Sequence, residues 1–94
     1  MTEAELLIRV KKGLGISGSY QDDTLQLHIA EVKEFLKDAG VPLTTINSDA
    51  SVGVIIRGVS DIWNYKSGEV KFSDYFMKRT IQLAIRPLEV VENV

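Results

Sequence analysis

The stretch SYQDDTLQLHIAEVKEFLKDAG, residues 19–40, constrains the fold more than any other part of the sequence, because it carries the signals of a complete helix. Its apolar residues recur at intervals of four, three, four and three, which places them on one helix face. They are Leu25, Ile29, Val32, Leu36 and Ala39. Gly40 stands where a left-handed residue often ends a helix, and Val41-Pro42 blocks continuation. We therefore predict a long amphipathic helix.

Asp22 and Asp23 open this helix and admit two interpretations. One is an N-terminal cap that also places negative charge at the positive end of the helix dipole. The other is a metal site or an acid–base pair. Adjacent helical residues diverge by about 100°, and the sequence contains no DxDxDG calcium loop. We therefore expect a cap.

A shorter helix is predicted from Thr2 to Leu14. Thr2 followed by Glu5 is the pattern of a capping box, in which each side chain accepts a hydrogen bond from the other residue's backbone amide. Four apolar residues share one stripe at helical spacing; they are Leu6, Leu7, Val10 and Leu14. Gly13 and Gly15 end the helix, and GISGS follows as a loop.

Residues 41–48 are predicted to connect the second helix to a third, which Ser48 or Asp49 can cap. Although many of its residues are β-branched, their period and the length of the segment favour a helix over a strand. The apolar set is Val52, Ile55, Ile56, Val59, Ile62 and Trp63. Gly53 and Gly58 each cost about 1 kcal/mol relative to alanine in a helix. Their missing side chains would let another helix approach closely.

A fourth helix is predicted from a cap at Ser73 or Asp74 to about Arg86. Its expected inner face consists of Met77, Ile81, Ala84, Ile85 and Leu88. Pro87 is expected to stop it, which leaves residues 88–94 as a short C-terminal tail.

The sequence therefore predicts an all-α fold. We expect one domain, residues 1–94, of about four helices, with the second and third helices at its centre. Residues 69–72 alternate between apolar and polar types and form a candidate for a short extended piece.

Composition narrows the classes of function. The chain has 94 residues and a net charge of −2, without the basic surplus of a tight non-specific nucleic-acid binder. The sequence has no cysteine, which excludes disulfides, thiolate zinc sites and cysteine nucleophiles. No apolar run approaches the roughly 20 residues that span a bilayer, and the N-terminus begins acidic, unlike a signal peptide. We expect an intracellular protein with no membrane partner.

No pattern predicts an enzyme, a cofactor or a metal site. His28 is the single histidine and lies beside Leu25 and Val32 on the predicted helix. Packing at the edge of the core is favoured, because a structural zinc ion needs about four ligands. The sequence lacks the GxSxG motif of a serine nucleophile. The glycine-rich GLGISG fits neither the dinucleotide nor the P-loop pattern.

Two regions are candidate interfaces. Five of the seven aromatic residues lie between positions 63 and 76; they either close a corner of the core or present an anchor to a partner, since Trp and Tyr dominate interface hot spots. The tail either frays or becomes ordered on a partner. Together with the charged flank of the second helix, the predicted interface residues are Glu34, Lys37, Trp63, Tyr65, Tyr75, Leu88, Val90 and Val91.

Two segments resemble the phage head–tail connector, or DNA-packaging adaptor, family. DDTLQLHIAEVKEFL follows a short helix and a glycine-rich loop, and VSDIWNYKSG resembles that family's aromatic and basic helix end. The fourth helix with its arginine–proline ending is compatible. The resemblance covers most of residues 3–87, and the residues that carry it are Asp22, Asp23, Leu25, Ile29, Trp63 and Tyr65.

The resemblance implies a small all-α structural protein that forms a ring beneath the portal, extends the DNA channel and joins head to tail, without catalysis. Its implied partners are further copies of itself, the portal protein and a head-completion or tail protein, with DNA passing through non-specifically. It would occur in the host cytoplasm during assembly and then at the head–tail junction of the virion.

A ring needs two different faces on each copy. We expect the second helix to pack the core and to contribute one of them. The alternative function is a small DNA-binding regulator, with KDAGVPLTTINSDASVGVIIRG as a helix-turn-helix. In its recognition helix only Arg57 could contact DNA bases, whereas such helices usually carry several long polar side chains that do so.

Overall fold

The computed structural model describes residues 1–64 and 72–92, with the backbone alone for residues 86–92. The described helices are α1 (Glu3–Leu14), α2 (Asp22–Asp38), α3 (Leu43–Ile46), the 3-10 turn η1 (Asp49–Ser51), α4 (Val52–Trp63) and α5 (Asp74–Glu92). This part of the chain contains no strand. The predicted all-α fold is confirmed, and the segment predicted as a connection, residues 41–48, contains the short helix α3. Except for Phe72, the candidate extended piece at 69–72 lies outside the described residues.

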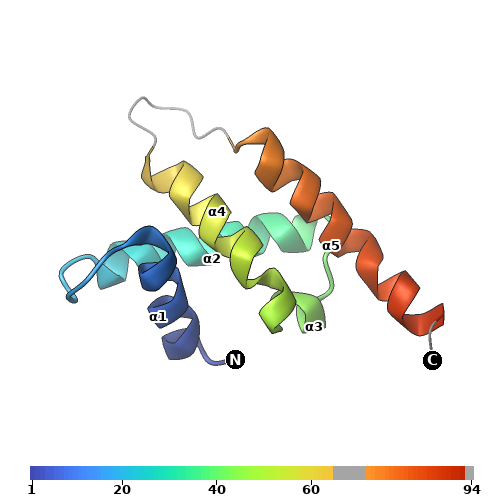
Figure 1. Ribbon diagram of the computed structural model, residues 1–94, viewed down its shortest axis with the longest axis horizontal. Coiled ribbons are helices and arrows are strands. Elements are labelled where there is room, and N and C mark those ends of the chain that lie inside the picture. Colours follow the sequence, from blue (N-terminus) through green and yellow to red (C-terminus); the bar gives the residue numbers. More distant parts are fainter. Residues whose placement is uncertain (65–71, 93–94) are drawn as a thin grey trace.

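Helices α2 and α4 pack together at the centre of the molecule, as predicted. Figure 1 shows α1 near one end of the long axis and α5 near the other, with α4 between them. α1 packs on both central helices, and α5 packs on α4. The buried apolar core is Leu6, Val10, Leu25, Ile29, Val32, Leu36, Val41, Ile46, Val54, Ile55, Val59, Ile62, Phe76 and Leu83.

Two predicted helix ends are confirmed. The Glu5 amide donates to Thr2 Oγ1 at 3.1 Å and the Thr2 amide donates to Glu5 Oε1 at 3.3 Å, which completes the capping box of α1. At the end of α2, the Val41 amide donates to the Leu36 carbonyl at 3.0 Å and the Gly40 amide donates to that of Lys37 at 3.1 Å. These two bonds form a Schellman motif. It needs a left-handed residue, and Gly40 supplies it with φ +95°.

The predicted cap at the start of α2 is wrong. Gln21 occupies the N-cap position, and no side chain caps the helix. Asp22 Oδ1 instead accepts a 2.7 Å hydrogen bond from Lys11 Nζ, which also donates to the Gly18 carbonyl. The ammonium group of α1 thus engages the carboxylate that could have capped α2. Asp22 and Asp23 still lie in the first turn, where negative charge faces the positive end of the helix dipole.

The turn before α4 follows its predicted cap. Ser48 Oγ accepts a hydrogen bond from the Ala50 amide at 3.3 Å. Ser51 is buried and donates to the Ile46 carbonyl at 2.6 Å, so its hydroxyl is satisfied inside the core. These bonds join the end of α3 to the start of α4.

One of the two glycines of α4 permits a close helix approach. A Cβ atom on Gly58 would lie 2.6 Å from Phe76 Cε1 and 3.0 Å from both methyl carbons of Val32. The expected close approach is therefore confirmed at Gly58. It is wrong for Gly53, because nothing lies within 4 Å of a Cβ atom placed there.

The predicted inner face of α5 is largely wrong. Met77, Ile81 and Ile85 are exposed, and the helix instead buries the neighbouring side. That buried side consists of Phe76, Thr80 and Leu83, with Ala84 partly buried against the core. The physical reason is that α5 carries two apolar stripes. The space above Gly58 accommodates Phe76, and this fixes which stripe turns inward.

The predicted stop at Pro87 is also wrong, because α5 continues to Glu92. Proline removes one backbone hydrogen bond, but its fixed φ of roughly −65° is helical. The helix therefore continues through Pro87 and includes most of the predicted tail.

Candidate functional site

Most of the described aromatic residues pack inside the domain. Phe72 and Phe76 stack with ring centroids 4.5 Å apart, and Phe35 of α2 lies 4.8 and 5.4 Å from them. Trp63 meets His28 edge to face at 5.9 Å. For these residues the core-closing interpretation is confirmed, and His28 packs at the core boundary as predicted.

A polar cluster holds the start of α5 against α4. The Ser73 amide and hydroxyl both donate to Asp61 Oδ2 at 2.9 Å, and Arg57 Nε lies 3.3 Å from Asp61 Oδ1. Ser73 Oγ accepts from the Phe76 amide at 3.2 Å, so Ser73 caps α5 as the sequence predicts. The Asp61 side chain is only 9% exposed. This cluster sets where α5 begins and therefore the direction in which its outer side faces.

The predicted interface residues do not form one surface. Glu34 and Lys37 are exposed on α2, and Tyr75 is exposed near the start of α5. Trp63 is partly buried against His28, so only part of its side chain is accessible to a partner. Tyr65 lies outside the described residues, as do the side chains of Leu88, Val90 and Val91.

The outer side of α5 is a surface made of residues that were predicted to face the core. Met77, Ile81 and Ile85 are 42, 61 and 51% exposed, and Lys78 lies among them. We call these four residues the α5 outer stripe. The signal was present in the sequence, because residues 74–86 carry apolar residues at helical spacing on two sides. Only one of these sides faces the domain's own core.

The outer side of α2 has a different chemistry. Four exposed residues recur there at intervals of four, three and four, namely Leu27, Glu31, Glu34 and Asp38. We call them the α2 acidic stripe. Glu34 lies two positions from both Val32 and Leu36, about 200° around the helix, so this stripe faces away from the core. The apolar seam of α2 is buried, which leaves only its charged side available as the predicted ring face.

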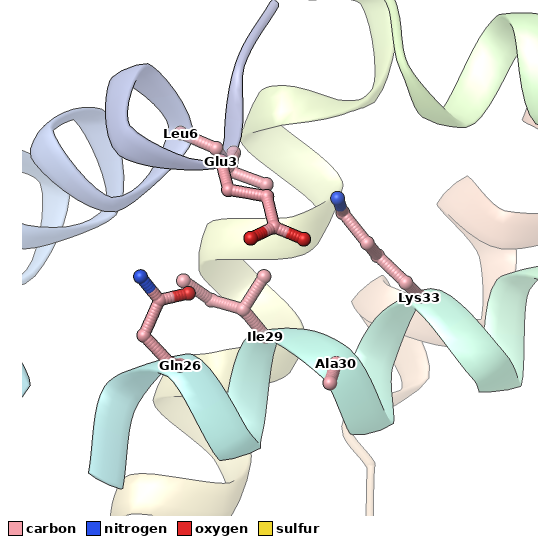
Figure 2. A pocket seen from close by; sticks show the side chains of 6 residues that line it. All are labelled: Glu3, Leu6, Gln26, Ile29, Ala30 and Lys33. Atoms are coloured by element: carbon pink, nitrogen blue, oxygen red, sulfur yellow. The ribbon is translucent and has the colours of Figure 1, made fainter. Parts of the chain in front are cut away.

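Two hollows lie beside this stripe, on the flank of α2. The smaller, about 70 Å³, lies between α1 and α2, with Leu6, Ile29 and Ala30 among its lining residues. Figure 2 shows Glu3 and Lys33 extending their charged groups over it from the two helices. The larger, about 290 Å³, is lined by α2 and the α3 region and includes both Glu34 and Lys37. The two share Ala30 and Lys33, so they form neighbouring depressions on one flank.

The described residues contain no cluster of three or more side chains able to hold a metal ion. Within the same part of the chain, every helix is too short or too polar to cross a bilayer.

Comparison with known proteins found no matching family model, no similar curated protein and no similar solved structure.

Proposed function

We propose that this protein is a structural subunit of a phage or prophage particle, a head–tail connector that assembles into a ring beneath the portal. The ring would extend the DNA channel and receive the next head-completion or tail protein. The resemblance of DDTLQLHIAEVKEFL and VSDIWNYKSG to that family supports the proposal. The all-α fold is compatible with it.

One observation carries the assembly part of the proposal. Helix α5 is apolar on two neighbouring sides, and its own domain covers only one of them. A helix that is apolar on more than one side is normally buried on more than one side. The outer stripe of α5 therefore favours a protein that works in contact with other subunits over one that works alone.

Charge is compatible with a DNA channel. The net charge is −2, and binding to DNA phosphates grows with each Lys or Arg that neutralises one. A mildly acidic subunit would let DNA slide through a ring without gripping it.

The regulator alternative is disfavoured by the position of α4. This helix would have to enter the major groove as the recognition helix. It is instead the centre of the core, with only Gly53 and Arg57 exposed along its length. Arg57 is engaged by Asp61 and Ser73.

The experiment is native mass measurement and negative-stain imaging of the concentrated protein, alone and with the matching portal protein. We expect a closed ring of roughly a dozen copies, the cyclic assembly that head-to-tail contacts generate when the rotation closes. A ring that appears only on the portal also supports the proposal. Absence of a ring and of portal binding, together with salt-dependent DNA binding, would overturn it in favour of the regulator.

A further inference from the structure

Both outer stripes are exposed in the single chain, and they differ in chemistry. The α5 outer stripe is apolar with one ammonium group, that of Lys78, and the exposed Asp74 lies one turn before it. The α2 acidic stripe offers three carboxylates and an exposed leucine, Leu27, which is 71% exposed. The apolar side chain of Leu27 and the opposite charges of Lys78 and the three carboxylates make the two stripes complementary.

We propose that the α5 outer stripe of one copy docks on the α2 acidic stripe of a second copy. This contact rests on the proposed function in that it names the two faces through which ring subunits meet. Ile81 and Ile85 would pack along the aliphatic stems of the α2 carboxylates and against Leu27, and Lys78 would lie among those carboxylates.

The lengths of the two stripes agree. Positions 77 to 85 span about 12 Å of helix axis and positions 27 to 38 about 16 Å, at 1.5 Å per residue. Two or three turns of each helix can therefore lie side by side, with Ile81 near the middle of one stripe and Glu31 and Glu34 near the middle of the other.

Charge favours this face of α2 over the neighbouring hollows. Lys33 lines both hollows and Lys37 lines the larger one. Each hollow has a single carboxylate beside these lysines, Glu3 in the smaller and Glu34 in the larger, so Lys78 would meet like charge there, which is unfavourable. On the acidic stripe it meets Glu31, Glu34 and Asp38.

The geometry also makes the contact propagate. Each stripe is exposed on its own domain; on α5, Met77 borders the buried side, while Ile81 and Ile85 are each about 200° from the buried Leu83. A chain therefore cannot cover its own stripe, and a docked pair still has one free stripe of each kind. Such a head-to-tail contact gives a closed ring or an open filament.

Cross-linking tests the contact directly, because the chain has no cysteine of its own. We would prepare Glu31→Cys and Ile81→Cys proteins separately, mix them and add a short bis-maleimide. These positions are central in the two stripes, so they lie close whether the helices run parallel or antiparallel. In the matched control, Ile8→Cys takes the place of Glu31→Cys. Ile8 is an apolar residue on α1 whose side chain is exposed to about the same extent as that of Ile81.

We expect the Glu31→Cys and Ile81→Cys mixture to give heterodimers at least several-fold faster than the control mixture. A chain carrying both cysteines should give a ladder of multimers. Equal rates in the two mixtures would overturn the proposal. So would Ile81→Cys homodimers as the main product, because they would mean that α5 pairs with itself.

The outcome separates this contact from the connector proposal. Wild-type rings without the 31–81 cross-link would reject the contact and keep the connector. A 31–81 ladder that images as open filaments, with no portal binding, would keep the contact and reject the connector.

Discussion

Phe76 of α5 packs directly on the backbone of α4 at Gly58, where a Cβ atom would lie 2.6 Å from Phe76 Cε1. Phe76 is completely buried, and its ring also stacks on Phe72 and lies beside Phe35. This contact is where α2, α4 and α5 meet. It decides the rotation of α5 and hence which of its two apolar stripes faces outward.

Gly58→Ala is therefore expected to destabilise the protein. The added methyl group would collide with the Phe76 ring and with Val32. Overpacking of this kind costs roughly 1–3 kcal/mol, and at contacts as close as these we expect it to outweigh the gain of about 1 kcal/mol from alanine's helix propensity. Urea unfolding followed by circular dichroism measures the change.

Gly53→Ala is the matched control, because the space around Gly53 is open. It should stabilise the protein by up to about 1 kcal/mol, through helix propensity alone. If the two alanine variants had the same free energy of unfolding, the close approach at Gly58 would not exist as described.

The polar cluster between α4 and α5 gives a second prediction. Asp61→Ala removes the acceptor of both the Ser73 amide and the Ser73 hydroxyl. Because this carboxylate is nearly buried, we expect a loss of about 1–3 kcal/mol in the free energy of unfolding, the cost of leaving partly buried donors unsatisfied. Thermal or urea unfolding provides the measurement.

Asp49→Ala is its control. Asp49 also pairs with an arginine, Arg9, at 2.7 Å, but its side chain is 81% exposed. Exposed ion pairs contribute about 0–1 kcal/mol, so this variant should remain near the wild type. A larger effect at Asp49 than at Asp61 would contradict the assigned role of the cluster.

These contacts show which parts of the fold the sequence could predict. Local signals were sufficient where the partner is nearby in the chain, as in the Thr2–Glu5 capping box and the Gly40 helix end. Local signals gave a wrong prediction where a residue distant in the chain makes the contact. Asp22 lies one position inside α2 and not at its N-cap, and its carboxylate accepts a hydrogen bond from Lys11, eleven positions earlier.

The predicted inner face of α5 was wrong for a related reason. Its two apolar stripes have the same helical spacing, so periodicity alone could not choose between them. The choice depends on the space above Gly58, which lies on a different helix. The exposed charges of Glu34 and Lys37 were predictable, whereas the sequence could not tell which of the two apolar stripes of α5 would be exposed.

The capping box of α1 gives a prediction about pH. Hydrogen bonding by the Thr2 side chain, and secondly by its backbone amide, holds the pKa of Glu5 below the ordinary value of 4.5. A lowered pKa in the folded state means that the contribution to stability is fully present above pH 4.5. It is lost as the pH falls through the lower folded-state pKa.

Thr2→Val should therefore raise the Glu5 titration midpoint toward 4.5, as followed by NMR of the Glu5 carboxyl carbon. Thr24→Val, a substitution of the same kind at an exposed position on α2, should leave that midpoint unchanged. An unaltered midpoint in Thr2→Val would show that Thr2 is not the cause of the lowered pKa.

The complementary charges of the two stripes give the last prediction. Lys78→Glu places a carboxylate opposite the α2 acidic stripe, and Glu34→Lys places an ammonium group opposite Lys78. Each single variant should lower the yield of the 31–81 cross-link, and the combination of both in one chain should recover part of it. A rim pair is worth up to about 1 kcal/mol, so the expected change is a few-fold. Salt near 1 M, where the Debye length falls to roughly 3 Å, should reduce the difference between variants.

Lys12→Glu changes charge by the same amount at an exposed position on α1 and serves as the control. It should leave the cross-link yield near that of the wild type. Rescue in the double variant is the decisive result, because two independent losses of folding or solubility would add, whereas a restored yield requires the two positions to face each other. A double variant as poor as the worse single variant would remove Lys78 and Glu34 from the contact.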